Sequence, residues 1–192
     1  MRRRVSRYHP ADVRSHESGA PSGRCRGRCL RADTVSRILG VDLGERRIGL
    51  AVADVGIDIA RPFATVNRAR AIDDDAAALG VVCREQDVTE LVVGLPIEAS
   101  GVEGSMADGA RRWAAELGSR LSLPVTMRDE RLSSFEAERR LGRMPRGRSG
   151  GPPSRTQRNA YRARLDREAA AVILQDELDA RRTAPAERQE ER

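Results

Sequence analysis

Two short apolar runs, residues 38–41 and 48–53, flank a stretch that contains Gly44. Runs of this length on either side of a short Gly-containing turn predict an antiparallel β-hairpin. The first run is continuously apolar, as is typical of a strand covered on both faces, and it ends in Asp42. We therefore expect a sheet whose buried central strand carries a carboxylate at its end.

Further short segments follow in an order typical of α/β proteins. A third strand over 59–66 contains Pro62, which favours an edge position. Beyond it, the apolar spacing predicts strands over 91–95 and 125–127, helices over 71–86, 105–121, 133–141 and 160–182, and a long loop over 142–159. Ser133 with Glu136 three residues later predicts a capping box at the start of the third helix.

Charge is distributed unevenly over the 192 residues, whose formal net charge is +6. Residues 1–36 carry nine Arg against three acids and show no hydrophobic period, so we expect a disordered Arg-rich extension. Residues 139–167 hold ten Arg and a single acid, Asp166. A dense basic segment on an otherwise acidic domain predicts a phosphate-rich partner that binds at this segment. Arg-rich loops that are merely solvated produce the same pattern.

Several classes of protein are excluded by composition. The chain contains no Lys, which removes lysine nucleophiles, Schiff bases and P-loops. Aromatic residues make up only 3%, which argues against folds that stack bases on aromatic platforms. No apolar run approaches the length of a membrane helix, and no apolar signal segment opens the chain, so we expect no membrane partner.

The cysteines and histidines point to a reducing cytoplasm and away from histidine chemistry. The three cysteines form an odd set in a chain without a secretion signal, which favours a cytoplasmic location over a disulfide framework. His9, His16, Cys25 and Cys29 match no strong zinc template. Because both histidines of the chain lie in the expected extension, general-base catalysis by histidine is not expected.

Carboxylates at strand ends are the first candidate functional groups. Besides Asp42, the pair Asp129 and Glu130 follows a short apolar run, and sites in open α/β sheets gather outside the carboxyl ends of strands. Side chains alternate along a strand, so one of this pair faces the site and the other faces away. The structural alternatives are a local turn cap by Asp42 and a salt bridge from the pair to Arg128 or Arg131.

Asp166 is the third candidate. It shares a helix face with Ala170 and Ile173, which aims a carboxylate at the core beside the basic segment. A helix N-terminus or an Arg neighbour could satisfy it, and so could a metal ion. If Asp166 meets Asp42 and one of the strand-end pair, their mutual repulsion demands cations. Mg²⁺ or Mn²⁺ suits such hard oxygen ligands, and two such ions promote phosphodiester hydrolysis.

Four motifs in order resemble the YqgF/RuvX family. They are Arg37-Ile-Leu-Gly-Val-Asp42-Leu-Gly with Arg47-Ile-Gly-Leu-Ala-Val-Ala-Asp54, then Val93-Gly-Leu-Pro96, Asp129-Glu-Arg-Leu-Ser133 and Asp166-Arg-Glu-Ala-Ala-Ala-Val-Ile-Leu-Gln175. The similarity spans residues 37–179, and four ordered motifs are far more specific than a lone Asp-x-Gly.

The resemblance implies an RNase H-like α/β fold, with three layers and a five-stranded mixed sheet, in a domain over residues 37–182 followed by a polar tail over 183–192. It also implies a bacterial cytoplasmic nuclease that matures the 5′ end of pre-16S rRNA. The family's acidic positions carry onto Asp42, Glu130 and Asp166 as catalytic and metal-binding residues for Mg²⁺ or Mn²⁺, with Asp129 as the alternate to Glu130.

Arginines of the basic segment are the expected contacts to nucleic acid. Arg131 is expected to orient the site. The residues expected to track the phosphate backbone are Arg146, Arg148, Arg155, Arg158, Arg162 and Arg164. Such contacts position a substrate without reading its sequence, and they make binding sensitive to salt.

Two other functions remain open at this point, and a third is disfavoured by length. A four-way-junction DNA resolvase would favour a twofold dimer over a monomer, because a junction presents symmetric arms. A non-catalytic module that binds rRNA or the transcription machinery would bind RNA without metal. Asp42-x-Gly44 before a hairpin also resembles the phosphate loop of actin-like sugar kinases, but those kinases need a second lobe for which this chain is too short.

Overall fold

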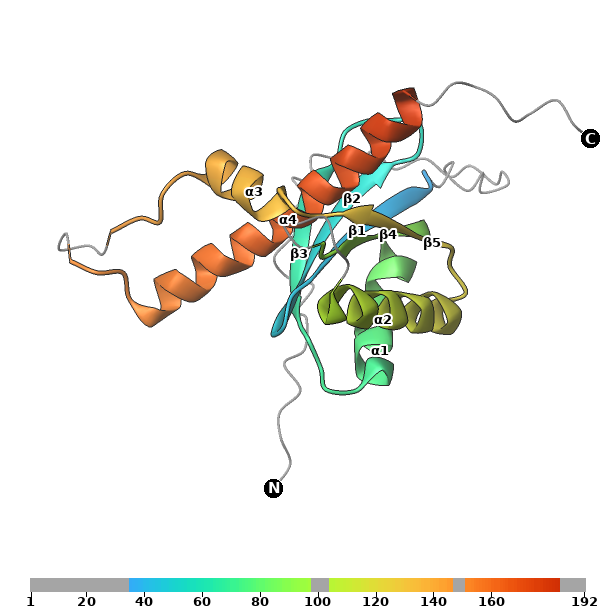
Figure 1. Cartoon of the computed structure of the whole chain (residues 1–192), viewed down its shortest axis with the longest axis horizontal. Coiled ribbons are helices and arrows are strands. Elements are labelled where there is room, and N and C mark those ends of the chain that lie inside the picture. Colours follow the sequence, from blue (N-terminus) through green and yellow to red (C-terminus); the bar gives the residue numbers. More distant parts are fainter. Residues whose placement is uncertain (1–34, 98–103, 147–150, 184–192) are drawn as a thin grey trace, which may run out of the picture. The chain divides into compact units, whose positions relative to one another are not determined.

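The computed structural model describes residues 35–97, 104–146 and 151–183 (Figure 1). The elements in chain order are β1 (Arg37–Leu43), β2 (Arg47–Asp54), β3 (Arg61–Asn67), α1 (Ile72–Glu85), β4 (Val88–Leu95), α2 (Ser105–Leu121), β5 (Val125–Asp129), α3 (Ser133–Leu141) and α4 (Arg155–Thr183). Almost all of the expected N-terminal extension and C-terminal tail, and Arg148, lie outside the described residues.

The five strands form one mixed sheet in the order β3-β2-β1-β4-β5. β1, β2 and β3 form an antiparallel meander, and β4 and β5 continue the sheet parallel to β1. The predicted hairpin and the five-stranded mixed sheet are confirmed, and this topology is RNase H-like. β3 is an edge strand as expected, and Pro62 lies beside a register shift in the β2–β3 pairing.

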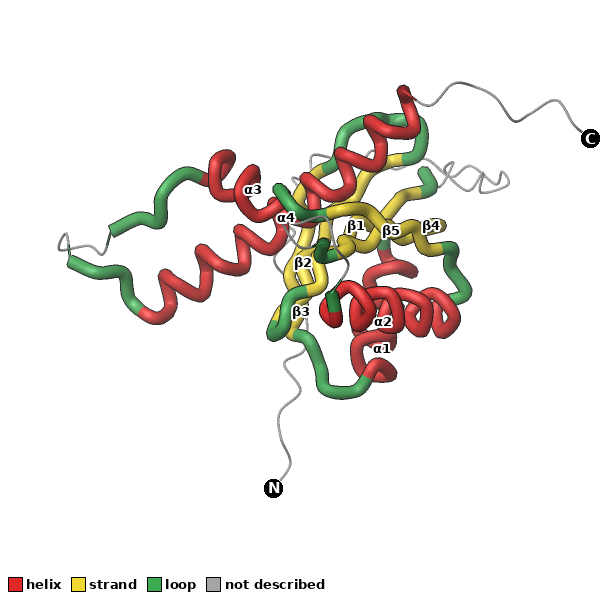
Figure 2. Tube along the Cα trace, viewed as in Figure 1, coloured by secondary structure: helices red, strands yellow, loops and turns green. Residues whose placement is uncertain are grey.

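Helices cover the sheet on both faces, so the domain has three layers (Figure 2). α1 and α2 pack on one face and α4 lies across the other, with α3 against α4. Successive residues of β1 divide between the two layers, because side chains alternate along a strand. Leu39 and Val41 pack in the core under α1 and α2, whereas Ile38 packs in the core under α4. Within the described residues, none of the helices is both long and apolar enough to cross a bilayer.

Glycines in β1 and β2 allow α4 to lie unusually close to the sheet. A Cβ atom at Gly40 would come within 2.7 Å of the Leu174 Cβ, and one at Gly49 within 2.0 Å of the backbone oxygen of Asp166. Thr65 in β3 adds a hydrogen bond from Oγ1 to the backbone oxygen of Ala163, at 2.7 Å. These contacts fix the turn of α4 that carries Asp166 directly over β2.

The start of α4 differs from the expected one. The helix begins at Arg155, five residues before the predicted boundary, because Ser154 and Gln157 form a reciprocal capping box. Gln157 N donates to Ser154 Oγ at 3.2 Å, and Ser154 N donates to Gln157 Oε1 at 2.8 Å. The loop before α4 is therefore shorter than predicted.

The predicted capping box of α3 is wrong. Leu132 is the N-cap residue and makes no side-chain capping bond, and Ser133 is already the first helical residue. The Glu136 carboxylate instead binds Arg139 and Arg140 one turn further on.

Replacing Gly49 with Ala should destabilise the fold, because the added methyl group would overlap the Asp166 backbone. We expect a loss of about 3 kcal/mol in the free energy of unfolding, measured by urea denaturation. The matched control is Gly109→Ala in α2, where a Cβ meets nothing within 4 Å. That change should be neutral or stabilise by about 0.5–1 kcal/mol. Equal effects of the two variants would contradict the close approach of α4.

Candidate active site

Asp42 lies near the end of central strand β1, opposite Gly49 of β2. It follows Gly40 by two positions and therefore faces the α4 side of the sheet. Among the described residues its carboxylate receives no hydrogen bond, so the local turn cap considered above is not formed. Burial, and next the nearby negative charge of Asp166, raise the pKa of Asp42 to about 7.

Glu130 follows β5 directly and lies on the same side of the sheet as Asp42. Its Oε2 atom is buried and has no hydrogen-bond partner among the described residues. The absence of a side chain at Gly94 makes room for it, since a Cβ there would lie 2.0 Å from Glu130 Oε2. Burial, then the charges of Asp42 and Asp129, raise the pKa of Glu130 to about 7. An unpartnered buried carboxylate oxygen is a position suited to a cation.

Asp129 is occupied by a local partner. Oδ1 accepts the backbone N–H of Arg131 at 3.0 Å, and Oδ2 accepts from Arg131 Nε at 2.8 Å. Burial raises the pKa of Asp129, but the bonds and charge of Arg131 outweigh burial and hold the pKa below its usual range. Glu130 rather than Asp129 therefore presents the free carboxylate. Arg131 binds Asp129 and not Glu130.

Asp166 approaches the other acids from α4, and it is engaged by an arginine. It lies over Gly49, the residue that pairs with Asp42, and its negative charge contributes to the raised pKa of Asp42. Oδ2 of Asp166 accepts a hydrogen bond from Arg47 Nε in a partly buried ion pair. An Arg neighbour of Asp166 was one of the expected alternatives, but its identity as Arg47 was not predicted from the sequence.

The three acids thus form a chain of neighbours, in which Asp42 lies between Glu130 and Asp166. In the part of the chain that the structure describes, no three His, Cys, Asp or Glu residues are already arranged to hold a metal ion. The donor set nevertheless fits a hard divalent cation, because all its ligands are carboxylate oxygens and one of them is buried without a partner.

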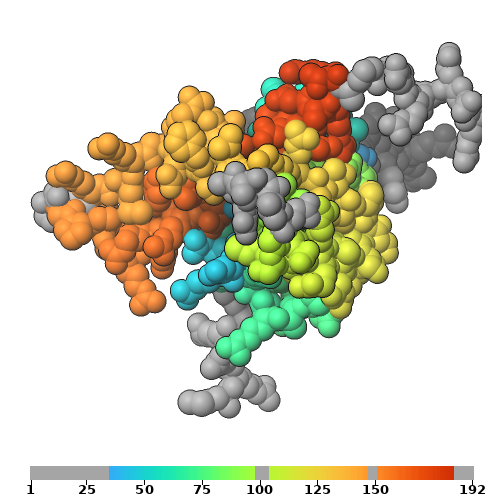
Figure 3. Space-filling model, viewed as in Figure 1, coloured from blue at the N-terminus to red at the C-terminus, as the bar shows by residue number. Residues whose placement is uncertain are grey.

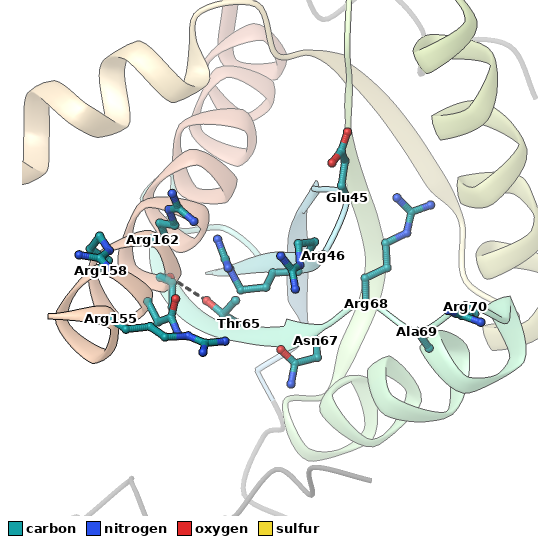
Figure 4. Close-up of a pocket in the computed structure, with 13 residues that line it drawn as sticks. Glu45, Arg46, Thr65, Asn67, Arg68, Ala69, Arg70, Arg155, Arg158 and Arg162 are labelled. Atoms are coloured by element: carbon teal, nitrogen blue, oxygen red, sulfur yellow. Dashed lines mark hydrogen bonds between the residues drawn. The ribbon is translucent and has the colours of Figure 1, made fainter. Parts of the chain in front are cut away.

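A cleft of about 1090 Å³ lies between the β1–β2 turn, the end of β3 and the first turns of α4 (Figure 4). None of the three acids lines it, but its lining residue Arg47 is bonded to Asp166. Glu45 is its sole acidic lining residue among the described residues. Seven arginines line it: Arg46, Arg47, Arg68, Arg70, Arg155, Arg158 and Arg162. In the space-filling view, the first half of α4 (orange) and the blue residues after β1 lie on the same face (Figure 3). Such a cleft has the charge to bind a polyanion.

The expected nucleic-acid contacts divide into distinct groups. Arg155, Arg158 and Arg162 line the cleft. Arg146 and Arg164 are exposed but are not part of its lining.

Four other arginines of the cleft were not expected from the sequence, because they lie far from the basic segment: Arg46, Arg47, Arg68 and Arg70. The fold brings them to it through the hairpin turn and the segment after β3. There Arg68 donates from Nη1 to the Gly44 backbone oxygen at 3.1 Å. The paired arginines beside Gly44 were a visible signal of this surface.

Comparison with known proteins gives one family. A family model described as "RuvX: Holliday junction resolvase" matches residues 36–180. The chain is 50% identical over 145 residues to a protein of Anaeromyxobacter dehalogenans (strain 2CP-C) named "Putative pre-16S rRNA nuclease", covering 76% of this chain and 98% of the relative. A relative of the same name from Chloroflexus aurantiacus (strain ATCC 29366 / DSM 635 / J-10-fl) is 41% identical over 148 residues, covering 77% of this chain and 90% of the relative.

Among solved structures, RuvC of T. thermophilus in complex with a Holliday junction substrate is similar with a TM-score of 0.45 and 17% sequence identity. The match covers 77% of this chain and 96% of that one.

The raised pKa values predict a pH-dependent difference in stability. In metal-free protein, Asp42 and Glu130 stabilise the fold while protonated, so their contribution is complete below pH ~4 and is lost as pH rises through about 7. The double variant Asp42→Asn/Glu130→Gln stays neutral at both positions. Its free energy of unfolding relative to the unmodified protein should therefore rise between pH ~5 and ~8, by on the order of 1 kcal/mol per pH unit.

Urea denaturation in the presence of a chelator measures this difference. Asp129→Asn is the control, because the lowered pKa of Asp129 predicts no such gain. A difference between the double variant and the unmodified protein that stays constant over this pH range would show that the two carboxyls are not protonated in the fold.

Proposed function

The chain belongs to the RuvX family, and we propose from this premise that residues 37–182 form a metal-dependent endonuclease domain that matures the 5′ end of precursor 16S rRNA in the cytoplasm. The nuclease hydrolyses phosphodiester bonds. The observation that carries the proposal is the link between a group of half-buried carboxylates on one face of the sheet and an arginine-lined cleft, which the Arg47–Asp166 ion pair connects.

The carboxylates hold the divalent cations. Asp42, Glu130 and Asp166 would bind Mg²⁺ or Mn²⁺, supported by their all-oxygen donor set and by the unpartnered Oε2 of Glu130. Divalent cations bound there supply Lewis acidity that activates water and neutralises charge on a phosphodiester. The raised pKa values of Asp42 and Glu130 mean that cations and protons compete for the same oxygens.

The arginines of the cleft hold the phosphate backbone of the substrate. Their planar guanidinium groups bind phosphate oxygens in pairs and keep their charge at any physiological pH. They carry no information about base sequence, so recognition of the precursor depends on the shape of the RNA and on salt. The choice of precursor rRNA as the substrate follows the names of the relatives.

A second candidate substrate is branched DNA, which the description of the matching family model favours. Both substrates present closely spaced phosphates to the same carboxylates. They differ in symmetry, because a junction engages a twofold dimer most naturally, whereas a single RNA end can be processed by a monomer.

Asp42→Asn should abolish cleavage, lowering the rate by about 100-fold or more, because one carboxylate of the cation site is lost. The assay compares precursor rRNA with a synthetic four-way junction, each with and without Mn²⁺, and circular dichroism checks that the variant is folded. Asp129→Asn should retain most of the activity, because Asp129 is bound by Arg131.

The same assay separates the proposed function from its rivals. Cleavage of the junction alone would assign the enzyme to DNA. Unchanged cleavage by Asp42→Asn would remove the proposed mechanism.

Arg162→Ser should weaken RNA binding and lower the dependence of log Kd on log salt concentration by about 0.7–0.9, the value for one lost phosphate contact. The control is Arg164→Ser, two residues away on the same helix and equally exposed, but outside the cleft lining. Filter binding of a short RNA over a salt series measures both variants. Equal slopes for Arg162→Ser and Arg164→Ser would show that the cleft is not the path of the backbone.

A further inference from the structure

Arg47 belongs to both halves of the site. Its side chain is part of the lining of the arginine-rich cleft. The same side chain donates from Nε to Oδ2 of Asp166, across the boundary between the cleft and the carboxylates. This bond uses one of the five N–H donors of the guanidinium group.

The bond competes with a cation for Asp166. While Arg47 holds Oδ2, a positive charge already neutralises the carboxylate that the proposed function assigns to a divalent ion. The Arg47 guanidinium therefore supplies the positive charge that a bound metal ion would otherwise supply to Asp166.

Of the two partners, Arg47 is the one free to move. Asp166 is carried by a turn of α4 that lies against Gly49 and is tied to β3 by the bond from Thr65 to the backbone of Ala163. Arg47 is the first residue of β2, and its long side chain ends in the cleft region. A rotation of this side chain toward the cleft would release Asp166 without moving the backbone.

A phosphate group offers Arg47 an alternative partner. Besides Arg47, which is paired with Asp166, the lining of the cleft contains six arginines, and Glu45 is the one carboxylate in that lining among the described residues. A phosphate matches the geometry of the guanidinium fork as well as a carboxylate does. An anion entering this excess of positive charge would compete directly for the Arg47 side chain.

We propose that Arg47 couples substrate binding to metal binding: a phosphate of the nucleic acid draws Arg47 from Asp166 and so frees this carboxylate for the divalent cation. The coupling rests on the proposed function, in which Asp166 is a metal ligand. By linkage, the cation then strengthens binding of the nucleic acid by the same factor. Arg47 is a positioning residue here, and it acts through Asp166.

Mn²⁺ binding to the full chain tests the coupling directly. Free Mn²⁺ is measured by electron paramagnetic resonance, with and without a 2′-O-methyl RNA 12-mer whose integrity is checked on a denaturing gel. For the unmodified protein we expect the oligonucleotide to tighten Mn²⁺ binding roughly tenfold, the scale of one hydrogen bond to a charged group. Arg47→Met should bind Mn²⁺ roughly tenfold more tightly without the oligonucleotide, and the oligonucleotide should then change its affinity less than twofold.

Two further variants separate this role from a general effect of charge. Arg46→Met removes the same charge from the adjacent residue of the same cleft, but Arg46 has no bond to Asp166, so Mn²⁺ binding without the oligonucleotide should not change. Arg47→Lys keeps a cation beside Asp166 and should restore most of the coupling. Urea midpoints confirm that each variant is folded.

The outcomes distinguish this inference from the function on which it rests. Unchanged or weaker Mn²⁺ binding by Arg47→Met overturns the coupling, because Arg47 then does not compete with the metal. An equal gain in Arg46→Met also overturns it, since the effect is then general electrostatics. If the Asp42→Asn variant binds Mn²⁺ as tightly as the unmodified protein does, the metal site itself is refuted, and the proposed function fails together with the coupling.

Discussion

The contact of α4 with Gly40 and Gly49 determines where the carboxylates of this domain can meet. With side chains at these two positions, the helix would be held away from the sheet, and Asp166 would be moved away from Asp42. The glycines weaken their strands intrinsically, because they add no packing and lose much entropy on folding. Because both glycines lie under α4, they let Asp166 on this helix come close enough to Asp42 on β1 for the two carboxylates to interact electrostatically.

Three carboxylates gathered in this way repel one another, and the protein meets this cost in two different ways. Asp42 and Glu130 have raised pKa values, so that near neutral pH each is protonated for much of the time when no cation is bound. Asp166 is instead neutralised by Arg47. The domain can therefore fold before any ion binds, although burial of three unpaired charges would cost many kcal/mol.

The sequence predicted those parts of the site that follow from strand and helix periodicity. Asp42 ends a continuously apolar run, and Asp166 shares a helix face with Ala170, so each could be assigned to a layer. The sequence did not show which of Asp129 and Glu130 faces the site. That choice depends on the local bond of Asp129 to Arg131 and on the space above Gly94. Such close contacts arise from packing and are not encoded in a spacing.

The helix starts show a different limit. Ser133 with Glu136 and Ser154 with Gln157 are equally good capping patterns, yet only the second pair forms the box. Glu136 has two arginines one turn away that compete for its carboxylate, whereas Gln157 is neutral and, among the described residues, bonds with Ser154. In α3, the ion pairs of Glu136 with two arginines of its own helix replace the capping box that the spacing predicts.

A count of arginines along the chain describes the basic surface poorly, because ion pairs neutralise some arginines of the basic segment and the fold adds others from elsewhere. Arg139 and Arg140 lie in the dense basic segment, but they are paired with Glu136 on their own helix. Arg46 and Arg47 lie outside that segment, yet the hairpin turn brings them to the cleft. The turn joins the strand that carries Asp42 to the strand that packs under Asp166, and its residues Glu45, Arg46 and Arg47 line the cleft. Arg47 both pairs with Asp166 and lines the cleft, so in the proposed function the neutralisation of Asp166 and the binding of phosphate depend on the same side chain.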